Sequence, residues 1–167
     1  SEDDRIYTVE WETDAGSYPG LGLRYGNDLF VGWGTADSGV VVYEIAENGV
    51  LEGEWTYPGL ESIGSERVSP TQNATQLPGR YSIVGTNSDG TQYMGTLLIE
   101  QNGDVYQLTW GGLAGPATGV AIRVGDRLAG ASRSGLLARA GDRGRVRRVL
   151  PRPQRARLAR RVAHVQS

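Results

Sequence analysis

The chain reads VVVYEIAENGVLEGEWT from Val40 to Thr56, and this stretch decides the fold class. Two runs rich in β-branched and aromatic residues flank an Asn48-Gly49 pair. In the second run apolar residues alternate with glutamates, which is the pattern of a strand that buries one face. Asn-Gly pairs supply the positive φ angles that tight hairpin turns require. The stretch therefore predicts two antiparallel strands, Val40–Ile45 and Leu51–Thr56, joined by a hairpin.

The same combination of short alternating runs and turn residues recurs along most of the chain. Strands spaced about 8 to 12 residues apart, with turns rich in Gly, Asn and Asp, are typical of a meander that closes as a barrel or a sandwich. No segment before Ser132 has a helical period. We expect an all-β protein with about ten antiparallel strands. The expected strands are Ile6–Trp11, Gly22–Tyr25, Asp28–Trp33, Val40–Ile45, Leu51–Thr56, Tyr81–Thr86, Met94–Glu100, Val105–Trp110, Gly119–Val124 and Arg127–Gly130.

An internal repeat links two distant parts of the chain. When the sequence is shifted by 99 residues, Ile6–Leu29 aligns with Val105–Leu128 without a gap, and 8 of 24 positions are identical. The identities fall on strand interiors and on turn glycines, as a shared backbone geometry requires. The tandem repeat therefore predicts two copies of one unit.

The unit has seven strands and is cut at different places in its two copies. Residues 5–57 form the first copy, with strands three to seven, and residues 79–131 form the second copy, with strands one to five; residues 58–78 are a polar linker. We expect the first two strands of the second copy to complete a barrel with the first copy, in permuted order. The strands from Val105 onward are then redundant, and their unpaired edges predict a homodimer.

Residues 132–167 form a basic, non-β tail. Residues 1–126 hold 5 arginines and 18 acidic residues, whereas residues 127–167 hold 12 arginines and one acidic residue. Three interpretations remain open: a frameshifted reading of the gene, a native disordered tail, or an arm that binds nucleic acid. The frameshift fits the repeat best, because strands six and seven of the second copy are missing there. We expect disorder or an adventitious helix around 135–140 or 155–165, and no specific nucleic-acid partner.

The residue types limit the chemistry of the chain. It has no cysteine, and its one histidine, His164, lies in the basic tail. Disulfides and zinc sites of the Cys/His type are therefore excluded. Acidic residues such as Glu10, Glu44 and Glu52 occupy polar phases of strands, which is typical of a solvated face. We expect no catalytic site, metal or cofactor, and no apolar run approaches the ~18 residues of a membrane helix.

The segments Gly79-Arg80-Tyr81-Ser82-Ile83-Val84-Gly85-Thr86-Asn87 and Leu51-Glu52-Gly53-Glu54-Trp55 resemble small exported bacterial proteins of the calycin type. These proteins are lipocalin- and avidin-like in build, and the resemblance covers roughly Ile6–Ala131. It implies a calycin-like barrel in a secreted or periplasmic protein. Because such barrels commonly bind small apolar ligands at the barrel mouth, it also implies a binding protein and not an enzyme.

Two functions follow from these observations. The first is binding of a small apolar or sugar-like ligand, with the candidate residues Trp11, Trp33, Tyr43 and Trp55. Aromatic residues at strand positions either line such a cavity or fill the core. The second is a structural or adhesion-type repeat protein that binds macromolecules through its acidic outer faces. An internal cavity lined by the aromatic residues favours the first function, and a filled interior favours the second.

Overall fold

The regular structure in the described part of the chain consists almost entirely of β-strands. A computed structural model describes residues 2–14, 16–33, 38–72, 76–112, 116–132, 136–139 and 145–147. The only helical element within these ranges is one 3-10 turn, η1 (Glu2–Arg5). The expected all-β class with antiparallel pairing is confirmed. No helix in the described part of the chain is long and apolar enough to cross a membrane.

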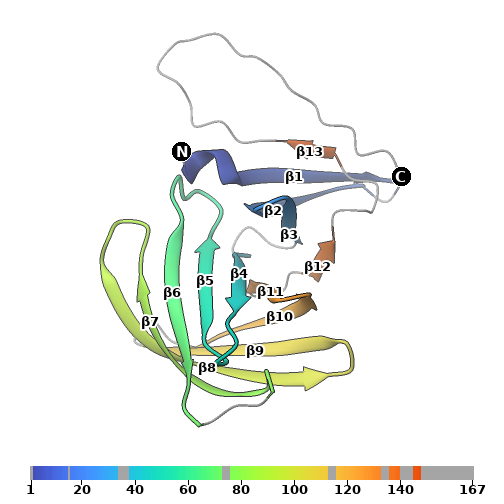
Figure 1. The fold of residues 1–167 in the computed structure, drawn as a ribbon. Helices are drawn as coiled ribbons and strands as arrows, with labels where there is room; N and C mark the ends of the chain where they lie inside the picture. The colour runs from blue at the N-terminus through green and yellow to red at the C-terminus, as the bar shows by residue number, and fades with distance from the viewer. Residues whose placement is uncertain are drawn as a thin grey trace.

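Eight consecutive strands close into an antiparallel barrel (Figure 1). Each strand pairs with the next one along the chain, and the last pairs with the first through Ala131 opposite Val40 and Arg127 opposite Glu44. Closure leaves the barrel strands without a free edge. The strands are β4 (Val40–Ile45), β5 (Leu51–Thr56), β6 (Gly64–Pro70), β7 (Gly79–Thr86), β8 (Gln92–Asn102), β9 (Val105–Gly112), β10 (Ala117–Val124) and β11 (Arg127–Ser132).

A second sheet of five strands lies beside the barrel, where Figure 1 shows the blue N-terminal strands. Its central strands are consecutive and antiparallel, and two short strands from the C-terminal part of the chain pair with the outer two. In spatial order the sheet consists of β12 (Leu136–Arg139), β3 (Asp28–Trp33), β2 (Gly16–Tyr25), β1 (Ile6–Thr13) and β13 (Arg145–Arg147).

Strand β4 belongs to two hydrophobic cores. Val41 and Tyr43 pack in the barrel interior, whereas Val40 and Val42 pack against Leu23 and its neighbours in the five-stranded sheet. These four residues, the first of the six in β4, are all buried. A strand covered on both faces has an unbroken apolar sequence, which explains the run of three valines and a tyrosine.

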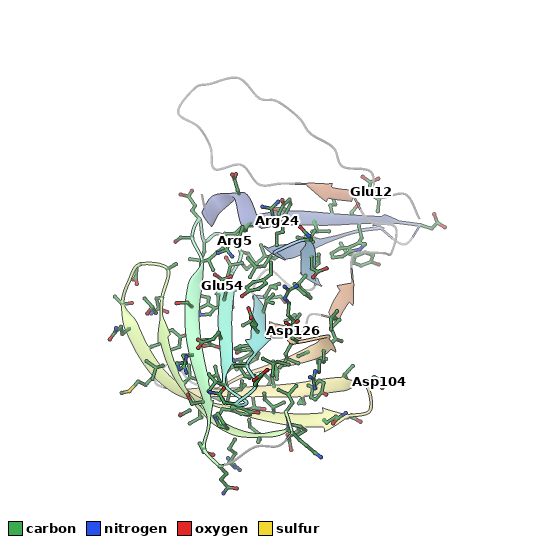
Figure 2. The ribbon with its side chains drawn as sticks, viewed as in Figure 1. Arg5, Glu12, Arg24, Glu54, Asp104 and Asp126 are labelled. Atoms are coloured by element: carbon green, nitrogen blue, oxygen red, sulfur yellow. The ribbon has the colours of Figure 1, made fainter. Side chains whose placement is uncertain are left out.

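Polar contacts also hold the five-stranded sheet against the barrel. Arg127, at the start of β11, donates to Asp28 of β3 over 2.6 Å, and its guanidinium carbon lies 5.0 Å from the centre of the Tyr25 ring. Arg5 donates to both carboxylate oxygens of Glu54 over 2.7 and 3.0 Å, and Figure 2 shows the two side chains pointing toward each other. These contacts join η1 and β3 to β5 and β11.

The two copies of the repeat share a local geometry. In the barrel, a Cβ atom on Gly119 would lie 2.8 Å from the ring of Trp110. In the five-stranded sheet, a Cβ atom on Gly20 would likewise overlap the ring of Trp11. Each tryptophan therefore covers a glycine of the neighbouring strand, and these residues are equivalent in the 99-residue shift. An origin of the two segments as copies of one unit stays a prediction.

The structure corrects the expected assignment of the copies to the barrel. The barrel contains all five strands of the second copy and only β4 and β5 of the first. The other three strands of the first copy, β1, β2 and β3, lie in the five-stranded sheet. Consecutive strands joined by short turns close with the smallest loss of chain entropy. The chain from Val40 to Ser132 holds enough of them to close by itself. Strands β9, β10 and β11 therefore have both edges paired, and a homodimer through those edges has no basis in the barrel.

The linker at 58–78 also differs from the expectation, because it contains strand β6. Gly64, Glu66 and Val68 are buried in this strand, and they alternate with exposed or half-exposed residues. Because Gly64 and Glu66 occupy two of the three buried positions, the sequence lacks the apolar alternation that predicts a strand.

The basic tail contains two strands where disorder or a helix was expected. Residues 136–139 pair with β3 and residues 145–147 pair with β1. The helix expected around 135–140 is therefore wrong, because the backbone at 136–139 extends the sheet edge of β3. The other expected helix, around 155–165, lies outside the described residues.

Candidate functional site

One end of the barrel is open and forms a mouth. The strands alternate in direction, so the first residues of β4, β6, β8 and β10 lie at the same end as the last residues of β5, β7, β9 and β11. At the opposite end Leu77 and Tyr81 pack in the core, and the Tyr81 hydroxyl donates to the Leu77 carbonyl over 2.6 Å. The barrel is therefore filled at one end and open at the other.

A cavity of about 350 Å³ occupies the mouth, and we call it the mouth cavity. Its size falls at the lower end of the ~300–1,000 Å³ that is usual for small-molecule sites. Aromatic and aliphatic side chains form most of its wall, and one carboxyl group, that of Glu66, reaches it. The lining residues on which the argument depends are Trp55, Tyr57, Glu66, Ile83, Tyr93 and Trp110.

Glu66 lies at the centre of a row of residues that crosses five strands. On one side, Tyr43 of β4 pairs with Gly53 of β5, which pairs with Glu66 of β6. A Cβ atom on Gly53 would lie 2.6 Å from the Tyr43 ring. Because this glycine has no side chain, the ring can cross it and donate its hydroxyl proton to Glu66 Oε1.

The other side of the row repeats this arrangement. Glu66 pairs with Gly85 of β7, which pairs with Tyr93 of β8. The Tyr93 ring covers Gly85 and leaves no room for a Cβ atom there. The Tyr93 hydroxyl donates to Glu66 Oε2 over 2.7 Å. The glutamate thus accepts one tyrosine proton on each oxygen, and each tyrosine reaches it across a glycine.

Two tryptophans fix the direction of these hydrogen bonds. Trp110 Nε1 donates to the Tyr43 hydroxyl over 3.1 Å, and Trp55 Nε1 donates to the Tyr93 hydroxyl over 2.9 Å. An indole nitrogen can only donate, so each hydroxyl accepts from a tryptophan and gives its own proton to Glu66. We call these five residues the carboxylate network. The direction of its hydrogen bonds suits an ionised carboxylate, which can only accept hydrogen bonds.

Burial opposes that ionised state. Only 7% of Glu66 is exposed, and its desolvation raises the carboxyl pKa above the usual value, while donation from Tyr43, Tyr93 and Trp110 works in the opposite direction. Desolvation and the neighbouring carboxylate also raise the pKa of the Tyr43 and Tyr93 hydroxyls. The tyrosines therefore keep their protons at neutral pH and act as fixed donors.

The structure separates the four aromatic residues that the sequence singled out. Trp55 lines the mouth cavity, and Tyr43 lies just behind it in the carboxylate network. Trp11 is on β1 in the five-stranded sheet. The backbone of Trp33 is on β3 of the same sheet, and its side chain is outside the described residues. Ligand binding by these residues stays a prediction.

Sequence reasoning missed three residues of the site. Trp110 was not among the four candidate residues, although its partner in the 99-residue shift, Trp11, was. Glu66 was hidden in the supposed linker, and Tyr93 lay one residue before an expected strand. Gly53 and Gly85 each lie opposite a tyrosine on one neighbouring strand and opposite Glu66 on the other. This arrangement could identify Glu66 and Tyr93, but it becomes visible only when the strand register is known.

The comparisons with known proteins leave the site to be judged on its geometry. No protein family matches the chain, and no curated protein and no solved structure matches it. Within the part of the chain that the structure describes, no group of three or more His, Cys, Asp or Glu residues is placed to hold a metal ion.

Proposed function

We propose that this protein is a binding protein whose mouth cavity holds a small, largely apolar ligand. The observation that carries the proposal is the cavity itself, with about 350 Å³ of space beside a well-packed core. Protein interiors are normally close-packed, and empty space of this size at the end of a barrel is typical of a ligand site. The resemblance to calycin barrels, which bind ligands at the mouth, points the same way.

The composition of the wall favours an apolar ligand over a sugar-like one. Aliphatic and aromatic side chains such as Val41, Ile83 and Trp110 face the space. A sugar needs several polar partners, because each buried hydroxyl without a hydrogen bond costs about 1–3 kcal/mol. The cavity also favours ligand binding over the adhesion-type function, for which a filled interior was expected. Export from a bacterial cell stays a prediction.

The proposed activity is binding without covalent chemistry. The hydrogen bonds from Tyr43 and Tyr93 oppose protonation of Glu66, and the raised pKa of the two hydroxyls keeps them protonated. A general base must take a proton from the substrate, and a general acid must give one up. Recovery of an unchanged ligand after prolonged incubation is the expected result.

Tryptophan fluorescence tests the proposal, because Trp55 and Trp110 line the cavity. Titration with neutral probes such as 2-phenylethanol and cyclohexanol should give saturable changes in emission. Ala117 lies at the mouth, so Ala117→Trp should fill the cavity and weaken binding at least tenfold. Val105 lies at the other end of β9, and Val105→Trp is the matched control that should bind normally. Equal binding by both variants would contradict a site in the mouth.

A further inference from the structure

The carboxylate of Glu66 has no cationic partner in the described part of the chain. Its partners are the neutral side chains of the carboxylate network. The arginines with ion pairs lie elsewhere: Arg5 binds Glu54, Arg67 binds Glu52 and Arg127 binds Asp28. A buried charge without a counter-charge costs several kcal/mol. The site therefore lacks one component, a positive charge.

The hydrogen bonds nevertheless prepare Glu66 to be negative. Each tyrosine hydroxyl accepts from an indole and donates to the carboxyl group, as derived above. A protonated glutamate would bring one donor too many into this arrangement. A carboxylate has about four acceptor positions. The tyrosines use two of them and Trp110 also donates to the carboxyl group, which leaves acceptor capacity for a group in the mouth cavity that Glu66 lines.

The surroundings of the carboxylate also suit a cation. The rings of Trp55, Tyr93 and Trp110 line the same cavity as Glu66, and Tyr57 lies edge-on to Trp55 with 5.5 Å between ring centres. Aromatic faces attract ammonium groups, and the attraction is strongest where water is excluded. Ile83 adds an aliphatic surface for the rest of a molecule.

We propose that the ligand of the mouth cavity is a small organic ammonium ion, whose charged nitrogen binds Glu66 and whose apolar part contacts the aromatic wall. This inference rests on the proposed function and names the chemical class of its ligand. The ammonium group supplies the positive charge that the chain itself does not place beside Glu66. It also supplies N–H donors for the acceptor positions that the tyrosines leave open.

The test compares two probes of nearly equal shape, 2-phenylethylamine and 2-phenylethanol, by calorimetry at pH 7. The wild-type protein should bind the amine at least tenfold more tightly than the alcohol. Glu66→Gln keeps the shape of the side chain and removes its charge, so it should weaken amine binding at least tenfold and change alcohol binding less than threefold. Glu100→Gln, on the exposed outer face of β8, is the matched control and should bind both probes normally.

Each other outcome is decisive. Equal binding of the two probes to the wild type, or tighter binding of the alcohol, overturns the inference and leaves the proposed function standing. Binding of neither probe contradicts the proposed function itself. Amine binding that survives in Glu66→Gln also overturns the inference. If that variant does not fold, the comparison of amine and alcohol on the wild-type protein still decides.

Discussion

Trp110 of the barrel and Trp11 of the five-stranded sheet occupy equivalent places, since each ring covers a glycine of the next strand. Their surroundings differ. The closed barrel adds β6, β7 and β8, which bring Glu66 and Tyr93 to the cavity that Trp110 lines. The five-stranded sheet has β13 at its β1 edge instead. The shared pattern therefore builds a sheet in both regions, and the candidate site arises from strands present only in the barrel.

The largest effects should come from filling the two equivalent glycines. Gly119→Ala and Gly20→Ala would each press a Cβ atom against a tryptophan ring and a backbone carbonyl oxygen. Overpacking of this kind costs about 2–3 kcal/mol, which chemical denaturation would measure. Gly119→Ala should also weaken probe binding at least tenfold, because it displaces Trp110.

Gly20→Ala should leave probe binding intact, since Trp11 lies in the other sheet. Gly112→Ala is a control for stability within the barrel, because its Cβ atom would approach nothing closer than 3.4 Å. Equal loss of probe binding in Gly119→Ala and Gly20→Ala would contradict a functional difference between the barrel and the five-stranded sheet.

A smaller effect is expected from removing one donor to the buried carboxylate. Tyr43→Phe deletes the hydroxyl that donates to Glu66, and hydrogen bonds to charged groups contribute about 1.5–3 kcal/mol. We expect the free energy of unfolding to fall by about 2 kcal/mol. Tyr7→Phe is the control in the five-stranded sheet, where the hydroxyl has no partner among the described residues. A loss below about 0.5 kcal/mol in Tyr43→Phe would contradict the carboxylate network.

The stability of the free protein should depend on pH through Glu66. Desolvation raises the pKa of this carboxyl in the folded protein above its ordinary value of 4.5. The folded state therefore holds its proton to higher pH than the unfolded state does. The resulting stabilisation is present below pH 4.5 and is lost as the pH rises through the raised pKa.

Unfolding measured between pH 4 and 8 in wild type and Glu66→Gln isolates this effect. The groups that face Glu66 are Tyr43 on β4, Tyr93 on β8 and Trp110 on β9, and none of them titrates in this range. The stability of the wild type relative to the variant should fall with rising pH. A rise of this relative stability with pH would mean that the hydrogen bonds lower the pKa of Glu66 by more than its desolvation raises it.

The smallest effect is expected where the two regions touch. Asp28→Asn weakens the contact with Arg127, and this pair is partly exposed, with 53% of the Asp28 side chain accessible. Exposed ion pairs contribute about 0.2–1 kcal/mol, so the free energy of unfolding should fall by about 0.5 kcal/mol and probe binding should not change. A loss of binding would show that the five-stranded sheet shapes the mouth cavity.

The sequence predicts the strands well because local signals determine them. Hairpins such as Val40–Thr56 carry both alternation and an Asn-Gly turn, and the structure pairs their strands as expected. The choice of strands that close the barrel could not be predicted in this way. Pairing of β4 with β11 joins Val40 to Ala131, and no local pattern records such a distant contact.

The candidate site was harder to predict because its residues break the local rules. Glu66 faces inward on β6, so the strand lacks the apolar alternation that identifies strands. Gly53 and Gly85 weaken their strands locally, and their role appears only when the tyrosines on the neighbouring strands are placed. The frameshift interpretation of the tail also stays a prediction, which the coding DNA after about codon 130 would check.

An NMR titration with 2-phenylethylamine, which follows the indole N–H signals of the tryptophans, tests directly whether the ligand binds in the mouth cavity. Single Trp→Phe variants assign the signals. The Trp55 and Trp110 signals should shift with one common saturation curve, because these residues line the mouth cavity and belong to the carboxylate network. The signal of Trp11 should not move. A saturable shift of Trp11 with no shift of Trp55 and Trp110 would contradict the central claim.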